Sequence, residues 1–76
     1  MTETEVKILS FYIASLYDIL EGEEITNLKC IIKDFEEVEL YEECEGIKRA
    51  IEFTEKHTVD QIKEEYNEQI LNQYGY

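Results

Sequence analysis

Apolar side chains recur with a helical period along most of the chain. In the first segment, apolar side chains larger than alanine fill ten of the fifteen positions from 6 to 20: Val6, Ile8, Leu9, Phe11, Tyr12, Ile13, Leu16, Tyr17, Ile19 and Leu20. At about 100° per residue this arc covers more than half of a helix, whereas one packed face needs a narrower stripe. We expect a helix that starts at a Thr2 or Thr4 cap and stops at Gly22. It should be buried on two sides, either at the centre of a bundle or by another chain.

The second segment carries a narrower stripe. Its apolar residues lie on one face of a helix over about 24–35: Ile25, Leu28, Ile31, Ile32 and Phe35. A strand over 28–35 is the alternative, because Ile and Phe also suit sheets. No turn signal follows this segment, and we favour the helix.

The third and fourth segments are also helical in pattern. One has apolar residues at i, i+4, i+7 and i+11, which predicts a helix over about 38–56: Leu40, Cys44, Ile47 and Ile51. Gly46 inside it is either tolerated at about 1 kcal/mol or marks a kink or break. Whether 34–39 is helix or connecting loop stays open. Thr58 and Gln61 fit a capping box at the start of a last helix. This helix carries a narrow apolar stripe of Val59, Ile62, Tyr66 and Ile70, and we expect its end, Tyr74-Gly75-Tyr76, to be frayed.

These segments predict an all-α fold, a compact bundle of about four short helices in a single domain over 1–76. The composition agrees, because the chain has no Pro and only three Gly among its 76 residues. A sheet protein of this size needs several tight turns, which favour those two residues.

The charge of the chain is strongly negative and unevenly distributed. The chain has 19 acidic and 7 basic residues, a formal charge of −12, and residues 21–45 hold ten of the acids but two of the bases. Residues 34–45, DFEEVELYEECE, contain seven acids and no Lys or Arg. The dipole of a helix beginning here would stabilise one or two of them by about 0.3–1 kcal/mol each. Like charges one turn apart repel, so the run costs stability.

Two interpretations of the acidic run are open, a solvated surface or a face for a basic partner, and we favour the second. Its partner-binding residues would be the acids with two aromatic anchors: Asp34, Phe35, Glu36, Glu37, Glu39, Tyr41, Glu42, Glu43 and Glu45. Direct binding of nucleic acid is disfavoured because it depends on Lys and Arg. Binding to an anionic membrane surface is disfavoured for the same reason.

The function that follows is an acidic inhibitor that occludes the basic nucleic-acid-binding site of a partner protein, as a decoy or an antitoxin-like antidote. A phage-made inhibitor of a host nuclease would use the same physics. The alternative is a self-associating helical module, structural or regulatory, in which the wide apolar arc forms a homodimer through Ile8 and Phe11.

Nothing in the chain has the pattern of a catalytic, metal or cofactor site, so we expect no enzyme. The one histidine, His57, falls at a helix junction, where capping is its expected role. Cys30 and Cys44 match no zinc spacing, and we expect small core or surface residues.

The start of the chain does not resemble a secretion signal, and its apolar stretch is too short to span a bilayer. We therefore expect a cytoplasmic protein with reduced cysteines. Three tyrosines are expected in the core and three at an interface: Tyr12, Tyr17 and Tyr66, then Tyr41, Tyr74 and Tyr76.

Overall fold

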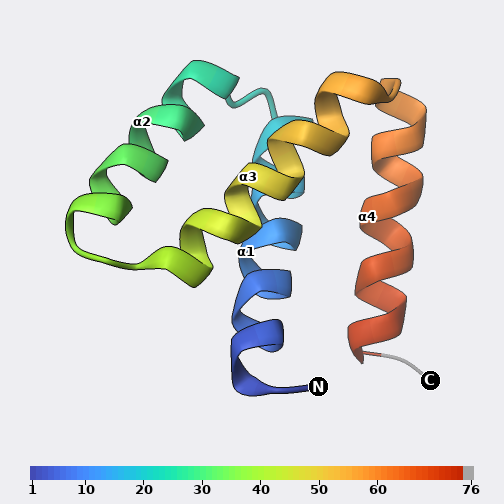
Figure 1. Cartoon of the computed structure of the whole chain (residues 1–76). Coiled ribbons are helices and arrows are strands. Elements are labelled where there is room, and N and C mark those ends of the chain that lie inside the picture. Colours follow the sequence, from blue (N-terminus) through green and yellow to red (C-terminus); the bar gives the residue numbers. More distant parts are fainter. Residues whose placement is uncertain (75–76) are drawn as a thin grey trace.

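The computed structural model describes residues 1–74 of the chain, with the side chains of residues 1–72. It contains four helices, α1 (Glu3–Leu20), α2 (Ile25–Glu37), α3 (Tyr41–Lys56) and α4 (Val59–Tyr74), and no strand over these residues (Figure 1). The prediction of an all-α fold of four short helices is confirmed, and 28–35 is helix rather than strand. The expected frayed end at Gly75 and Tyr76 lies outside the described residues.

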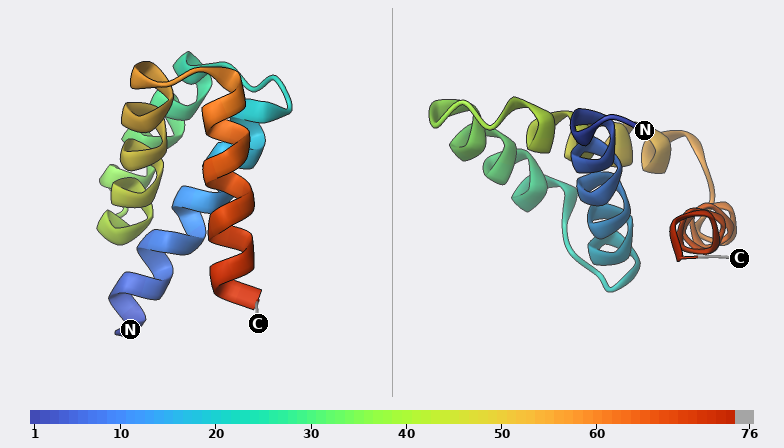
Figure 2. Two further views of the ribbon diagram at one scale, coloured as in Figure 1. Left: turned by 90° about the vertical axis from the view of Figure 1, so that its right-hand side faces the viewer. Right: turned by 90° about the horizontal axis from the view of Figure 1, so that it is seen from below.

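The helices form a flat arrangement in which α1 and α3 cross at the centre. α2 packs against one flank of this pair and α4 against the other (Figures 1 and 2). The principal extents are 36 × 29 × 18 Å, so the molecule is about two helices thick. The most extensive interface is the one between α1 and α3.

Each flank has its own hydrophobic cluster. The α2 side contains the buried residues Leu28, Ile32, Cys44, Ile47 and Ile51, with Phe11, Ile19, Ile25 and Phe35 packed around them. The α4 side contains Leu16, Ala50 and Ile62, with Tyr12, Leu20, Phe53 and Tyr66 packed around them. α1 and α3 contribute to both clusters, which explains the wide apolar arc of α1. The arc predicted a helix buried either at the centre of a bundle or by another chain, and the structure shows α1 at the centre of the bundle.

Three helix ends follow the sequence signals. The Thr2 hydroxyl oxygen accepts a hydrogen bond from the backbone N–H of Glu5 at 3.1 Å and caps α1. Gly22, with φ 101°, ends α1 in a Schellman turn, in which its N–H bonds Ile19 O and the next N–H bonds Asp18 O. At α4, Thr58 N–H donates to the Gln61 side chain and Gln61 N–H donates to the Thr58 hydroxyl, a complete capping box.

The boundary between α2 and α3 differs from the expected one. The third helix begins at Tyr41 rather than 38, and α2 continues to Glu37. A second Schellman turn separates them, because Leu40 N–H bonds Phe35 O at 2.9 Å and Glu39 N–H bonds Glu36 O at 3.1 Å. The left-handed position of this turn holds Glu39, with φ 63°, where a glycine is usual. The stop signal was therefore missing from the sequence.

Gly46 neither kinks nor ends α3, and its role is to let α1 approach. A Cβ on Gly46 would collide with the carbonyl oxygen of Ile8 and would lie 2.7 Å from Cβ of Phe11 and 2.9 Å from N of Tyr12. Two of these three atoms belong to the α1 backbone, which cannot move aside as a flexible side chain can. The absence of a side chain at this one position sets the distance between the central helices.

Gly46→Ala is expected to destabilise the protein by several kcal/mol, on the scale of an overpacked core. Helix propensity alone predicts the opposite sign, a gain of about 1 kcal/mol. Urea unfolding followed by circular dichroism measures the difference. Gly22→Ala is the control, because a Cβ there meets nothing within 4 Å. Its cost is the left-handed backbone alone, about 1 kcal/mol. Equal losses in the two variants would contradict the close approach.

Candidate functional site

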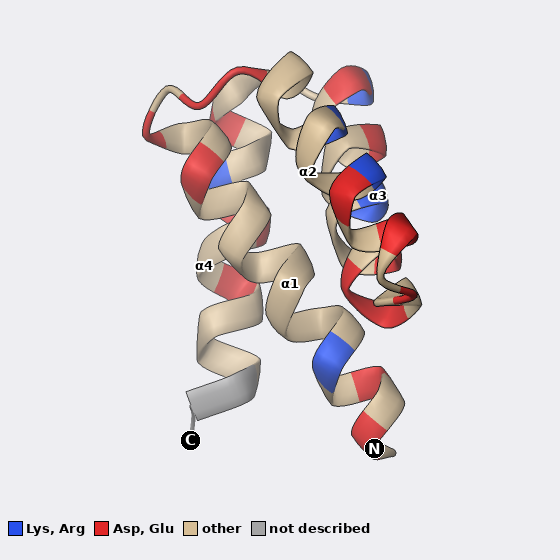
Figure 3. Cartoon of the chain, turned by 90° about the vertical axis from the view of Figure 1, so that its left-hand side faces the viewer, with Lys and Arg blue, Asp and Glu red and all other residues tan. Residues whose placement is uncertain are grey.

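The acidic segment 34–45 forms a corner of the molecule, which we call the acidic corner. It covers the last turn of α2, the connection 38–40 and the first turn of α3, so its acids do not share one helix face. Figure 3 shows the acidic positions crowded on this corner, with much of α1 free of charge. Residues 34–37 are helix and 38–40 are connection, so the acids lie on a bent surface.

Four of the seven acids lie at the C-terminal end of α2 or just beyond it. Asp34, Glu36 and Glu37 lie in the last turn of α2, which has no basic residue, and Glu39 comes one residue after the C-cap Val38. The C-terminal end of a helix carries a partial negative charge, so acids there are unfavourable. The gain expected from a helix start applies only to the first turn of α3, which contains Glu42 and Glu43.

Glu43 is not at the surface. Its exposed fraction is 8%, and its Oε1 has no hydrogen-bond partner. The α3 face that carries Glu43 also carries Ile47 and Ala50 into the protein interior. Glu43, expected to contact a partner, is therefore hidden from one.

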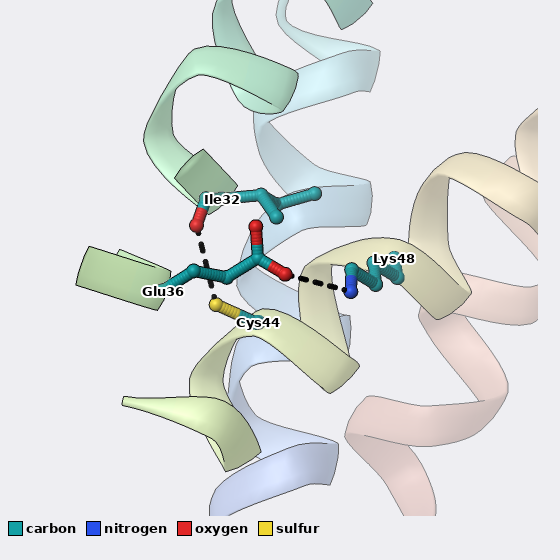
Figure 4. Close-up of polar contacts among 4 residues, drawn as sticks. All are labelled: Ile32, Glu36, Cys44 and Lys48. Atoms are coloured by element: carbon teal, nitrogen blue, oxygen red, sulfur yellow. Dashed lines mark hydrogen bonds and ion pairs between the residues drawn. The ribbon is translucent and has the colours of Figure 1, made fainter. Parts of the chain in front are cut away.

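Two acids of the corner are paired within the chain. Lys48 Nζ lies 3.2 Å from Glu36 Oε2, and Arg49 Nε lies 2.8 Å from Glu45 Oε2. The Glu36 pair joins α2 to α3 beside the hydrogen bond from Cys44 Sγ to the carbonyl oxygen of Ile32 (Figure 4). Exposed pairs of this kind contribute little stability, but they reduce the charge offered to a partner.

The exposed acids outside these ion pairs are Asp34, Glu37 and Glu39, with Glu42 half-buried at the edge. They surround apolar side chains that the fold leaves in solvent. Val38 is 64% exposed and Tyr41 59%. No signal in the sequence marks Val38, because a single valine among acids does not stand out as an aromatic residue does.

Phe35 lies elsewhere than expected. Its ring packs edge-on against Phe11, with centroids 6.1 Å apart, in the α2-side cluster. Both phenylalanines are therefore partly buried at the edge of this cluster, and the homodimer through Ile8 and Phe11 stays a prediction. Ile8 is half-buried and lines a groove between α1, α3 and α4.

The remaining polar candidates have structural roles. His57 caps α3, with its Nδ1 2.8 Å from the Phe53 carbonyl oxygen and its ring stacked on Phe53 at 3.9 Å. Cys30 is exposed and Cys44 is buried, and they form no disulfide. Burial raises the pKa of the Cys44 thiol above its ordinary value, which keeps it neutral.

Two of the three tyrosines expected in the core are there. Tyr12 and Tyr66 are half-buried in the α4-side cluster. Tyr17 is exposed, against expectation, and lies against Tyr66. The side chain of Tyr74 and all of Tyr76 are outside the described part. No helix within residues 1–74 has the length and apolar character needed to cross a membrane. In the same range no three acidic, His or Cys side chains gather as metal ligands would.

No protein-family model matches the chain, and neither a curated protein nor a solved structure shows a match to it. The site is therefore interpreted from its geometry and its charge.

Glu39→Gly is expected to stabilise the protein by about 1 kcal/mol, because it removes a left-handed non-glycine residue. Thermal or urea unfolding measures the change. The control is Glu37→Gly, which removes the same charge two residues earlier but lies within α2. That variant should lose about 1 kcal/mol by helix propensity. A loss of stability in Glu39→Gly would show that the Glu39 side chain contributes to the fold.

Glu43→Met is expected to raise the free energy of unfolding by about 1–3 kcal/mol, because it replaces a buried, unpartnered carboxylate with an apolar side chain of similar length. Urea denaturation measures this gain. Glu42→Met removes the adjacent, less buried carboxylate and should change stability far less. If Glu43→Met is the less stable of the two, the carboxylate has a stabilising role that its position does not reveal.

Proposed function

We propose that the protein is an acidic inhibitor that places the acidic corner against the basic nucleic-acid-binding site of a partner protein. It would act by occupying that site, sterically and electrostatically, with no chemical turnover. The setting would be the cytoplasm. The observation that carries the proposal is the concentration of locally unfavourable features in this one segment.

Four such features meet within twelve residues. Acids stand at the negative end of α2, Glu39 occupies a glycine conformation, Glu43 is buried without a partner, and Val38 and Tyr41 remain in solvent. A sequence selected for stability alone would avoid each of them, and local conflicts of this kind are expected at functional sites. The other helix connections follow the rules, as Gly22 and the Thr58 capping box illustrate.

The composition of the corner also suits a basic partner. Val38 and Tyr41 provide an apolar centre, and Asp34, Glu37 and Glu39 provide a charged rim. Apolar or aromatic anchors within a polar rim are the usual make-up of an interface hot spot. Unpaired carboxylates attract a basic surface and repel nucleic acid, so the partner would be engaged in place of its own ligand.

The test is a comparison of two variants with the same net charge. Asp34→Lys with Glu37→Lys reverses two exposed acids of the corner, and Glu64→Lys with Glu68→Lys reverses two exposed acids of α4. Each tagged protein captures partners from host lysate at low and high salt, and the partner retained by the wild type is then purified. Glu43 is left intact, because a lysine there would be buried.

The corner variant should bind this partner about tenfold or more weakly, the α4 variant should bind like the wild type, and salt should weaken binding. The purified partner should also release its nucleic acid when the wild-type protein is added. Equal binding by the two variants would refute the acidic corner as the contact. A partner that keeps its nucleic acid would refute the decoy mechanism.

A further inference from the structure

A groove on the other side of the molecule is not used by the proposed function. It lies between the first half of α1, the second half of α3 and the last turns of α4, with a volume of about 570 Å³. This volume falls within the range of small-molecule sites, about 300–1,000 Å³. The groove is lined mainly by the following residues: Ile8, Leu9, Tyr12, Arg49, Phe53 and His57.

A polar contact within the lining of the groove joins α1 to α4. The Tyr12 hydroxyl donates a hydrogen bond of 2.7 Å to Glu65 Oε2, and Gln69 Nε2 donates to the same oxygen at 3.2 Å. Burial, with the hydrogen bond and charge of Glu65, raises the pKa of Tyr12 well above its ordinary value. The phenol therefore stays neutral, and it holds α1 and α4 together at the groove. Ile8, Leu9 and Phe53 complete a half-buried apolar surface.

The rim of the groove carries two basic side chains, Arg49 and Lys56, both from α3, and Lys56 Nζ lies 3.3 Å from Glu52 Oε1. His57 caps this helix. Arg49 uses its Nε for Glu45, and its side chain is 58% exposed, so this pair is weak and leaves the terminal N–H groups for another contact. His57 uses Nδ1 for the Phe53 carbonyl and stacks on the Phe53 ring, which leaves Nε2 for another contact.

The charge balance of the groove differs from that of the protein. The groove is lined by two basic side chains, Arg49 and Lys56, and by two carboxylates, Glu5 and Glu52. The whole chain, by contrast, has 7 basic and 19 acidic residues. An anion therefore meets less repulsion here than at the acidic corner. A guanidinium beside an apolar wall recognises one anionic group attached to an apolar body.

We propose that this groove binds a small amphiphilic monoanion, an aromatic or aliphatic body with one carboxylate or sulfonate. The body would lie on Leu9 and Phe53, and the anionic group would meet Arg49. Because the protein as a whole is strongly acidic, an anionic lipid surface is disfavoured, and the ligand would be a free molecule.

The probe is 8-anilinonaphthalene-1-sulfonate, which joins an aromatic body to one sulfonate. Its neutral analogue N-phenyl-1-naphthylamine has the body alone. Fluorescence titrations of both are made at 0.15 M salt with the wild type, Arg49→Gln and Lys48→Gln. Lys48 is the matched control, because it is the preceding residue, is also ion-paired and exposed, and does not line the groove. Near-ultraviolet circular dichroism checks that each variant is folded.

The wild type should bind one sulfonate probe saturably. Arg49→Gln should weaken that binding about tenfold and leave the neutral probe unchanged. Lys48→Gln should change neither. A third variant, Leu9→Gln, should weaken both probes. Unsaturable binding, or equal binding of the sulfonate by Arg49→Gln and the wild type, would overturn the proposal. An equal loss in Arg49→Gln and Lys48→Gln would also overturn it, since only overall charge would then matter.

Discussion

The close approach of α1 and α3 at Gly46 is the constraint on which the rest of the structure depends. A helix pair this close leaves no room for a side chain at the crossing, and it places the backbone of α1 directly on α3. Both clusters are built on this pair, with Ile47 and Ile51 of α3 facing α2 and Ala50 facing α4. In a small chain with a limited core, such a contact determines where every other element can pack.

The same crossing separates the two surfaces of interest. α2 and the connection to α3 lie on one flank and form the acidic corner, and α4 lies on the other and closes one side of the groove (Figure 1). The acids therefore gather where the chain turns from α2 into α3. The aromatic wall of the groove forms where α1 and α4 are joined by Tyr12 and Glu65. One flank offers negative charge, and the other offers an apolar surface with equal numbers of basic and acidic side chains around it.

The elements were predictable from the sequence because their signals are local. Helical periodicity, the Thr2 and Thr58 caps and Gly22 depend on residues a few positions apart. The misplaced features depend on contacts between distant residues. The burial of Glu43 and the pairing of Phe11 with Phe35 require the helix crossing to be known. Glu39 gave no stop signal, because a left-handed glutamate looks like any other acid in a sequence. The acidic segment stands out in the sequence, but the sequence does not show which of its carboxylates the fold leaves exposed and unpaired.

One contact links the two surfaces. Arg49 stands on the rim of the groove, and its partner Glu45 belongs to the acidic corner. A monoanion that drew Arg49 toward the groove would release the Glu45 carboxylate and make the corner more negative. A basic partner that took Glu45 would likewise release Arg49 for an anion. Thermodynamic linkage makes this coupling reciprocal, and an exposed ion pair sets its size at about 1 kcal/mol or less. A shared arginine would thus allow a small molecule on one flank to tune the affinity of a protein on the other.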